Sequence, residues 1–253
     1  MGAEGTPIRI AAYADIHAHA DLRGRLRGEL ESVNDQADVL VLAGDLTFFG
    51  AIEEARVLIE ELHGLQIPII GILGNHDFEL SQEDSIRQAM IEAGVIMLDG
   101  GIHVVDVRGE RVGFAGVKGF CGGFGDRLVA PFGEAALKAF VRVGQIEAEK
   151  FSDALHRLRV TDPVDHVVAV VHYAPIRDTV VGESMDLWPF LGNSSLCEPI
   201  DRHGADVVFH GHAHYGSPFG RTPGGIPVYN VARPLVRTPI VHYLTPKSAS
   251  IAV

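Results

Sequence analysis

Apolar runs and stretches of helical spacing alternate along the first third of the chain. The runs at 8–15, 38–45 and 68–75 are rich in Ile, Val, Leu and Ala, which predicts three buried strands. Residues 22–34 and 51–64 repeat apolar side chains every three or four positions, which predicts two helices between the strands. Strand, helix and strand in repetition imply right-handed crossovers and a parallel sheet.

The pattern changes after residue 100. Residues 101–117 alternate and turn around Gly109, which predicts an antiparallel hairpin, and residues 133–159 have the spacing of a long helix. About ten strands with helices outside them predict two packed sheets in a layered α/β sandwich. Nothing divides the chain, so 1–253 is interpreted as a single domain. The remaining strands are expected at 165–175, 205–214, 226–232 and 239–245, with a short helix in 195–204.

The composition of the chain makes several classes of partner unlikely candidates. The chain has 253 residues, and 21 Lys and Arg against 33 Asp and Glu give a formal net charge of −12. No basic cluster is present that could follow a nucleic-acid backbone or an anionic membrane, so long nucleic acids and membranes are poor candidate partners. The two cysteines are too few for a disulfide framework and there is no export signal, so a cytoplasmic location is expected.

Ionisable and amide side chains gather where the predicted strands end. The carboxyl ends of parallel strands line the crevice in which open α/β sheets bind ligands. Asp-x-His and His-x-His spacing sets two side chains on the same side of an extended segment, so joint coordination of a metal is feasible. The positions are Asp15, His17, Asp45, Asn75, His76, His172, His212 and His214.

Each of these residues alone has a simpler explanation. A single Asp after a strand is usually a turn residue or a helix N-cap. Glycines directly before three of the positions, at 44, 74 and 211, permit sharp turns and close approach of the backbone to an ion. The simpler explanation is adopted for the histidines without a partner at ligand spacing: His63, His103, His156, His166, His203, His210 and His242.

In this order, the motifs "DIH", "GD", "GNHD", a later His and "GHAH" resemble the signature of the calcineurin-like metallophosphoesterases. That superfamily consists of dinuclear metal hydrolases, and the resemblance runs from Asp15 to His214. It implies a four-layer α/β/β/α sandwich of two mixed sheets flanked by helices. It also implies that Asp45 bridges two divalent ions, one held with Asp15, His17 and His214 and the other with Asn75, His172 and His212.

The resemblance gives His76 the part of a catalytic acid and substrate contact instead of a metal ligand. Asp77 is interpreted as a structural residue of the turn. Two cations and two carboxylates leave a surplus charge of about +2, which attracts a phosphate and stabilises hydroxide. Nitrogen and oxygen ligands without thiolate favour Mn, Fe or Zn over Ca or Mg.

The expected function is hydrolysis of phosphodiester, and also phosphomonoester, bonds in a small-molecule or nucleotide substrate by a metal-bridging hydroxide. "GDLTFFG" stands where protein phosphatases of the superfamily have "GDxVDRG", so the chain is more similar to small prokaryotic phosphodiesterase-like members. The alternatives are a phosphomonoesterase and a metal-binding scaffold protein with the same fold. A mononuclear zinc peptidase is disfavoured because no "HExxH" is present.

Three further residues are candidates for substrate binding. His19 follows His17 at a spacing of two, and the alternative is a rim histidine with a local hydrogen bond. The glycine-rich segment 116–126 fits neither a P-loop nor a dinucleotide fingerprint and is interpreted as a mobile rim or lid, with Phe120 and Phe124 available to stack on a base. A plain loop with its aromatics in the core is the equal alternative.

Overall fold

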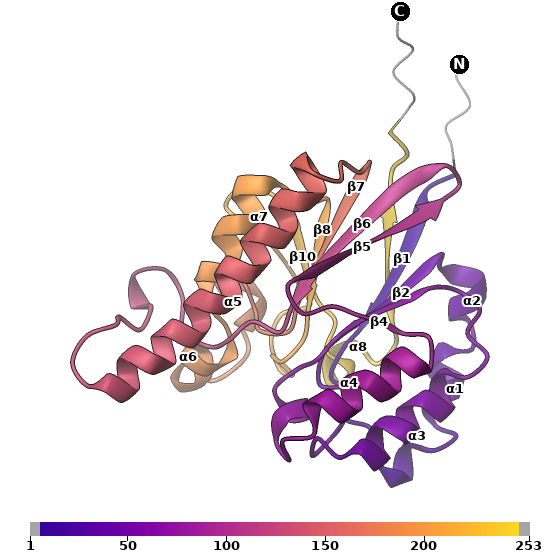
Figure 1. Cartoon of the computed structure of the whole chain (residues 1–253), viewed down its shortest axis with the longest axis horizontal. Coiled ribbons are helices and arrows are strands. Elements are labelled where there is room, and N and C mark those ends of the chain that lie inside the picture. The colour runs from indigo at the N-terminus through magenta and orange to yellow at the C-terminus, as the bar shows by residue number, and fades with distance from the viewer. Residues whose placement is uncertain (1–5, 248–253) are drawn as a thin grey trace, which may run out of the picture.

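Two β-sheets lie face to face at the centre of the molecule (Figure 1). The computed structural model describes residues 6–247. The first sheet has the order β11-β1-β2-β3-β4; its four consecutive strands are parallel and β11 is antiparallel. Its strands are β1 (Ile8–Tyr13), β2 (Val39–Ala43), β3 (Ile69–Ile72), β4 (Ile96–Met97) and β11 (Ile240–Leu244).

The second sheet is also mixed, with the order β5-β6-β7-β8-β10-β9. Strands β6, β7, β8 and β10 are parallel, while β5 and β9 run antiparallel to their neighbours. The strands are β5 (Gly101–Val107), β6 (Glu110–Val117), β7 (His166–Val171), β8 (Val207–His210), β9 (Phe219–Arg221) and β10 (Pro227–Asn230).

Helices cover the outer face of each sheet, so the layers are α/β/β/α as expected (Figure 1). Apolar side chains of β1 to β3 pack against α1 to α4 on one side, and those of β6 to β8 pack against α5 and α7 on the other. A third cluster fills the space between the sheets. The helices are α1 (Leu26–Leu30), α2 (Val33–Gln36), α3 (Ile52–Leu62), α4 (Glu83–Glu92), α5 (Ala135–Val160), α6 (Trp188–Leu191), α7 (Cys197–His203) and α8 (Arg233–Val236).

The hairpin and the long helix are confirmed. β5 and β6 pair antiparallel, and Arg108 and Gly109 both have positive φ, 52° and 86°, as a tight primed turn requires. The single helix expected at 22–34 is wrong. The segment is a 3₁₀ turn (Ala20–Leu22) followed by α1 and α2, and Gly24, whose φ of 74° a right-handed helix cannot contain, separates the turn from α1.

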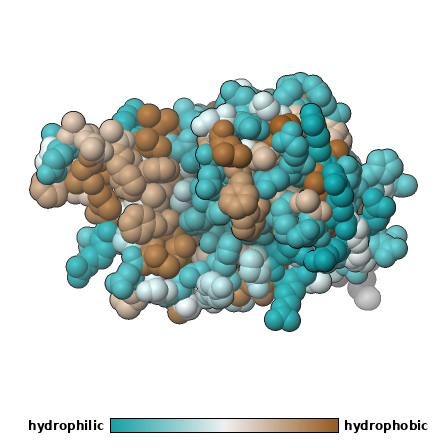
Figure 2. Space-filling model, turned by 90° about the horizontal axis from the view of Figure 1, so that it is seen from below, coloured by the Kyte–Doolittle hydropathy of each residue, from teal (hydrophilic) through white to brown (hydrophobic). Residues whose placement is uncertain are grey.

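Within residues 6–247, no helix is both long and apolar enough to cross a membrane. The carboxyl ends of the parallel strands of both sheets point downwards in Figure 1. Figure 2 views the molecule from that side and shows hydrophilic groups over most of the face. Apolar side chains gather at one end of it, over α6 and the loops beside it, where Phe132, Met185, Leu187 and Phe190 are exposed.

Candidate metal centre

The ends of five strands bring the candidate ligands to one edge between the sheets. Asp15 lies two residues after β1 and Asp45 two residues after β2. Asn75 lies three residues after β3, His172 follows β7 directly, and His212 lies two residues after β8. Both sheets therefore contribute, and the side chains meet where the two layers of strands end.

Three groups with metal-ligand composition form at this edge: Asp15, His17 and His214; Asp45, His172 and His212; and His17, Asp45 and His76. In the first, His214 Nε2 lies 2.9 Å from Asp15 Oδ1 and 3.4 Å from His17 Nε2. In the second, His172 Nε2 lies 2.9 Å from Asn75 Oδ1. It also lies 3.2 Å from Asp45 Oδ1, and His212 completes this group.

The geometry of these clusters fits bound metal ions. At metal-to-ligand distances of about 2.1 Å, neighbouring ligand atoms at a right angle lie about 3.0 Å apart, close to the separations found in the first two groups. Asp45 Oδ2 and His17 Nδ1 are buried and have no hydrogen-bond partner among the described residues. A buried carboxylate oxygen without a partner is unfavourable unless a ligand compensates it. Asp45 belongs to two of the three groups, one with His17 and His76 and the other with His172 and His212.

Hydrogen bonds on the outer side fix the rings of two of these histidines. His172 Nδ1 donates to the carbonyl of Ala43 (2.9 Å), so Nε2 is the nitrogen left free to bind a metal. His212 Nε2 donates to the carbonyl of Phe190 (3.1 Å), which leaves Nδ1. Backbone carbonyls thus orient both rings before any ion binds.

The backbone at this edge is strained. Asp15, His17, Asp45 and His212 all have φ between 49° and 71°, in the left-handed region that residues other than glycine rarely adopt. Such conformations cost about 1–3 kcal/mol each and cluster at functional sites. Four of the seven candidate ligands therefore have backbone conformations that are locally unfavourable, and the surrounding structure holds them there.

The positions before these ligands require glycine because there is no room for a side chain. A Cβ atom at Gly74 would lie 2.2 Å from the backbone nitrogen of Asp45, and one at Gly211 would lie 2.2 Å from Asp15 Oδ2. The missing side chains let one strand end pass directly against the ligand of a neighbouring strand. The glycines noted in the sequence therefore serve close approach.

The buried charges of the site compensate one another. Burial would raise the pKa values of Asp15 and Asp45, but the neighbouring histidines outweigh it and lower both. Burial would lower the pKa of His172, but the Asp45 carboxylate raises it to about 9. For His212 burial dominates and lowers the pKa to about 4.

His76 lies at the mouth of the site. Its Nδ1 donates to the carbonyl of Phe48 (2.7 Å), and its Nε2 points towards Asp45 Oδ2, 3.9 Å away. Its ring centroid lies 4.5 Å from that of His17. His76 also forms a metal-capable group with His17 and Asp45, so its position suits a metal ligand as well as a proton donor at the edge of the centre.

Asp77 fastens two strand ends to each other. Its Oδ1 accepts hydrogen bonds from Thr47 N (2.8 Å) and Thr47 Oγ1 (2.6 Å), and its Oδ2 accepts from Gly74 N (2.8 Å) and Leu46 N (3.2 Å). Burial, and then the charge of Asp45, raise the pKa of Asp77 to about 6. These contacts give Asp77 the structural role that was expected from the sequence.

The three candidate substrate residues lie in different places. His19 is exposed on the rim, with Nδ1 bound to the carbonyl of His17 (2.9 Å). Phe120 lies beside Tyr173 and lines a cavity that reaches Asn75. Phe124 is only 8% exposed, packs with Ala174 and other apolar side chains, and lines a different cavity together with Ile176 and Arg177.

Among the described residues, the other histidines and the two cysteines take no part in the metal-capable groups. Within the described residues, none of the seven histidines interpreted as structural joins a metal-capable cluster. Cys121 and Cys197 are free and buried, and burial raises the pKa of both thiols, which argues against a nucleophilic cysteine. The sequence did not single out Lys118, which lies in the same cavity as Phe120; its position within the glycine-rich segment was the only available signal.

The chain belongs to the calcineurin-like phosphoesterase family, whose model matches residues 8–216. A protein named 3',5'-cyclic-nucleotide phosphodiesterase from Nostoc sp. is 31% identical over 100 residues. That match covers 35% of this chain and 38% of the relative, so it spans little more than a third of the relative's length.

Solved structures share the fold at low identity. A putative 5'-nucleotidase from Staphylococcus aureus, in a complex with alpha-ketoglutarate, superposes with a TM-score of 0.57 at 14% identity, covering 89% of this chain and 48% of that one. The protein TT1561 of Thermus thermophilus gives 0.55 at 14% identity and 94% and 99% coverage. GAP50, described as the anchor in the inner membrane complex of Plasmodium, gives 0.55 at 10% identity and 91% and 73% coverage.

Proposed function

We propose that this phosphoesterase is a dinuclear metal-dependent enzyme that hydrolyses phosphodiester bonds of a small-molecule or nucleotide substrate. The observation that carries the proposal is the buried Asp45 Oδ2, which has no partner among the described residues and lies between two groups of ligands. The Nostoc relative named as a cyclic-nucleotide phosphodiesterase supports a diester over a monoester. Its partial match makes the substrate class a proposal for this chain.

The first metal would be held by Asp15, His17, Asp45 and His214, and the second by Asp45, Asn75, His172 and His212. When bound, the two ions supply Lewis acidity at the phosphoryl oxygens and lower the pKa of water to about 7. Mixed nitrogen and oxygen ligands favour Mn, Fe or Zn. Within the described residues, Cys121 and Cys197 lie outside the metal-capable groups, so no thiolate competes at the centre.

The chain's own residues orient the substrate and move the proton. A water oxygen adds to phosphorus, the ester P–O bond breaks, and the departing oxygen takes a proton. His76 holds that proton at Nε2, because its Nδ1 is committed to the carbonyl of Phe48. The products are a phosphomonoester, when the substrate is a diester, and an alcohol.

A comparison of two aspartates tests the dinuclear proposal. Asp45→Ala should lose both metal ions, while Asp15→Ala should keep part of the metal bound at the second site, because Asp45 belongs to two of the metal-capable groups and Asp15 to one. Metal content by elemental analysis after saturation with Mn, Zn or Fe is the direct readout. Hydrolysis of bis-p-nitrophenyl phosphate by the same samples is the second. One ion per wild-type chain, or equal losses in the two variants, would contradict the proposal.

A metal-binding scaffold protein is the second candidate function. GAP50, described as an anchor, has this fold, but at 10% identity the likeness concerns the fold alone. A wild-type protein that binds two ions and hydrolyses neither diesters nor monoesters would favour the scaffold. A rate on monoesters above the rate on diesters would favour a phosphomonoesterase.

A further inference from the structure

The outer half of α5, residues 135–146, projects beyond the two sheets at one end of the molecule (Figure 1). Burial along this helix begins at Gly144 and continues at Glu147 and Phe151, towards its carboxyl end. At a rise of about 1.5 Å per residue, the outer half is about 18 Å long. A helix of this length that adds little to the core of its own chain has surface left for another contact.

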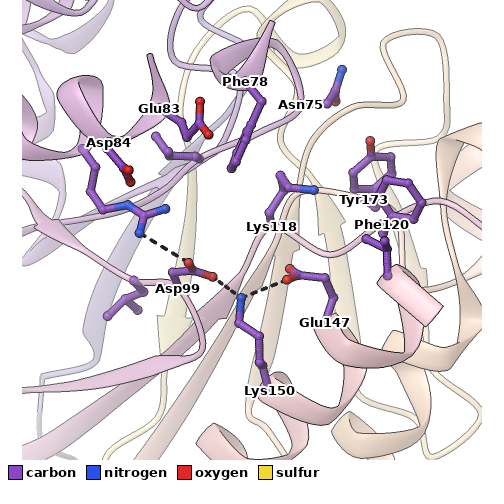
Figure 3. A pocket seen from close by; sticks show the side chains of 14 residues that line it. Asn75, Phe78, Glu83, Asp84, Asp99, Lys118, Phe120, Glu147, Lys150 and Tyr173 are labelled. Carbon is purple, nitrogen blue, oxygen red and sulfur yellow. Dashed lines mark hydrogen bonds and ion pairs between the residues drawn. The ribbon is translucent and has the colours of Figure 1, made fainter. Parts of the chain in front are cut away.

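An exposed apolar stripe follows the outer half of α5. Its side chains are spaced by three and four positions, so they lie along one side of the helix. They are Ala136, Ala139, Val143 and Ile146. The next position at this spacing is Lys150, which is bound to Asp99 and Glu147 in a polar network (Figure 3). The stripe therefore ends where α5 joins the body of the molecule.

The stripe is accompanied by the apolar end of the molecule, which Figure 2 shows over α6 and the loops beside it. The large side chains of the stripe and of this end are between 41% and 73% exposed: Phe132, Val143, Ile146, Met185, Leu187 and Phe190. At about 200 Å² for a large apolar side chain, they expose about 600 Å² per copy. A stable interface buries about 800 Å² per partner, rather more than half of it apolar, so this surface is large enough for one.

The sizes of the side chains in the stripe match an antiparallel copy of the same helix. If two α5 helices cross a two-fold axis level with residue 141, Ala139 of one copy faces Val143 of the other. Ala136 then faces Ile146 in the same way. Small side chains opposite large ones fill the space between close helices, whereas a parallel pair would set Ala against Ala and Ile against Ile. The stripe is therefore complementary to itself under two-fold symmetry.

Charge also favours contact at this end. Residues 125–146 contain three basic and two acidic residues: Arg127, Lys138, Arg142, Asp126 and Glu134. The segment has a net charge of three minus two, or +1, so the rest of a chain whose total is −12 has −13. Arg142, beside the stripe, is paired within its own chain with Glu149 (2.8 Å). Two copies of this acidic protein therefore repel each other least when they meet here.

We propose that this surface is the interface of a two-fold symmetric homodimer, in which the outer halves of two α5 helices pack antiparallel. The body of each copy then lies beside the apolar end of the other, where Phe132 and Phe190 are exposed. Val143 also lines a cavity of about 620 Å³ that reaches Asn75. The second copy would therefore border the opening of that cavity. The proposal does not depend on which ester the site hydrolyses.

The mass of the protein in solution is the first test. Sedimentation velocity of the full chain at micromolar concentration should give twice 27.2 kDa. Ile146→Glu should be monomeric, because the dimer would bury an unpaired carboxylate. Val160→Glu is the control: Val160 is an exposed apolar residue at the other end of α5, so this variant should stay dimeric. Circular dichroism should show both variants folded. A monomeric wild type, or a dimeric Ile146→Glu, would overturn the proposal.

A side-chain exchange tests the antiparallel register. Ala139→Val sets Val against Val, and Val143→Ala sets Ala against Ala, so each should weaken dimerisation about tenfold through overpacking or a cavity. The double variant restores Val opposite Ala and should recover a dissociation constant close to that of the wild type. Losses that add in the double variant would overturn this register.

A lipid surface is the other occupant to be tested. Flotation with phosphatidylcholine vesicles should leave the wild type unbound, because the dimer covers its apolar end. A wild type that floats with the vesicles, and loses this binding in Phe132→Ser, would overturn the dimer in favour of a membrane-docking surface.

Discussion

At the scale of single residues, one hydrogen bond fixes the orientation of the His76 ring. Its Nδ1 is bound to the Phe48 carbonyl, so Nε2 faces the centre and can hold a transferable proton. Of the candidate ligands, Asp15, Asp45 and His172 are almost completely buried. His76 is more exposed than these three, as a group that meets substrate should be.

His76→Ala should lower kcat about a hundredfold to ten-thousandfold on diesters with alkyl leaving groups, because a general acid matters most when the departing oxygen is basic. Loss on nitrophenyl esters should be smaller, since nitrophenolate leaves without a proton. Steady-state kinetics on both ester types and the metal content of the variant are the measurements. His63→Ala, at the end of α3, is the control. Loss of a metal from the variant would make His76 a ligand instead of an acid.

At the scale of the elements, the turn after β3 depends on the absence of one side chain. Gly74→Ala would place a Cβ atom 2.2 Å from both the backbone nitrogen and Oδ1 of Asp45. Overpacking of this kind costs about 1–3 kcal/mol, and here it also displaces the proposed bridging ligand. The variant should lose stability and metal affinity together.

Gly28→Ala is the matched control, because Gly28 lies inside α1 and a Cβ atom there meets nothing within 4 Å. That substitution should raise the free energy of unfolding by about 0.5–1 kcal/mol. Denaturant unfolding and metal titration of both variants decide the matter. Normal metal binding by Gly74→Ala would show that the turn can widen without disturbing Asp45.

The amino ends of the sheet depend on Asp38, which joins two arginines. It accepts hydrogen bonds from Arg9 N (2.8 Å), Arg9 Nη2 (3.0 Å) and Arg108 Nη1 (3.0 Å). Burial would raise the pKa of Asp38, but these donors outweigh it and lower the pKa below its usual 3.8. The carboxylate therefore contributes stability above about pH 4, and that contribution is lost as the pH falls through the lowered pKa.

Asp38→Asn should lower the free energy of unfolding by about 1–2 kcal/mol at pH 7. The difference from the wild type should shrink below pH 4, where the wild-type carboxyl becomes protonated. Urea unfolding between pH 3 and pH 7 measures this, with the exposed Asp126→Asn as the control. A difference that does not change with pH would mean that packing, not charge, is the source of the stability.

At the scale of the whole molecule, the two sheets share one core. Side chains from β1, β2 and β3 pack directly against side chains of β6, β7 and β8 between the sheets. We therefore expect the two sheets to unfold cooperatively as one unit, as the single-domain prediction implies. Both cysteines lie in the cluster on the outer side of the second sheet, where they can report the opening of that sheet.

Cys121 and Cys197 are 8% and 7% exposed, and burial raises the pKa of Cys197 to about 12. Thiol labelling should therefore be slow in the native state, and its denaturant midpoint should coincide with that of far-UV circular dichroism, which reports both sheets. The variants Cys121→Ala and Cys197→Ala assign the signal to each thiol. Labelling complete before the loss of ellipticity would show that the second sheet opens independently.

The sequence by itself determined the alternation of strands and helices and the residues that follow the strand ends. These features depend on local periodicity and on spacings of one or two residues, which any fold with parallel strands brings to the same edge. It predicted the hairpin at 101–117 for the same reason, because Gly109 is a local turn signal. The helix expected at 22–34 failed because its apolar spacing does not register the positive φ of Gly24.

Only the tertiary structure decided which atoms face one another. The orientation of His172 depends on a carbonyl 129 positions away in the chain, and the four bonds of Asp77 depend on how two strand ends approach. Phe120 and Phe124 are four residues apart in one loop, yet they line different cavities and pack against different apolar clusters. Burial and the direction of a ring arise from contacts between distant segments, and no local pattern encodes them.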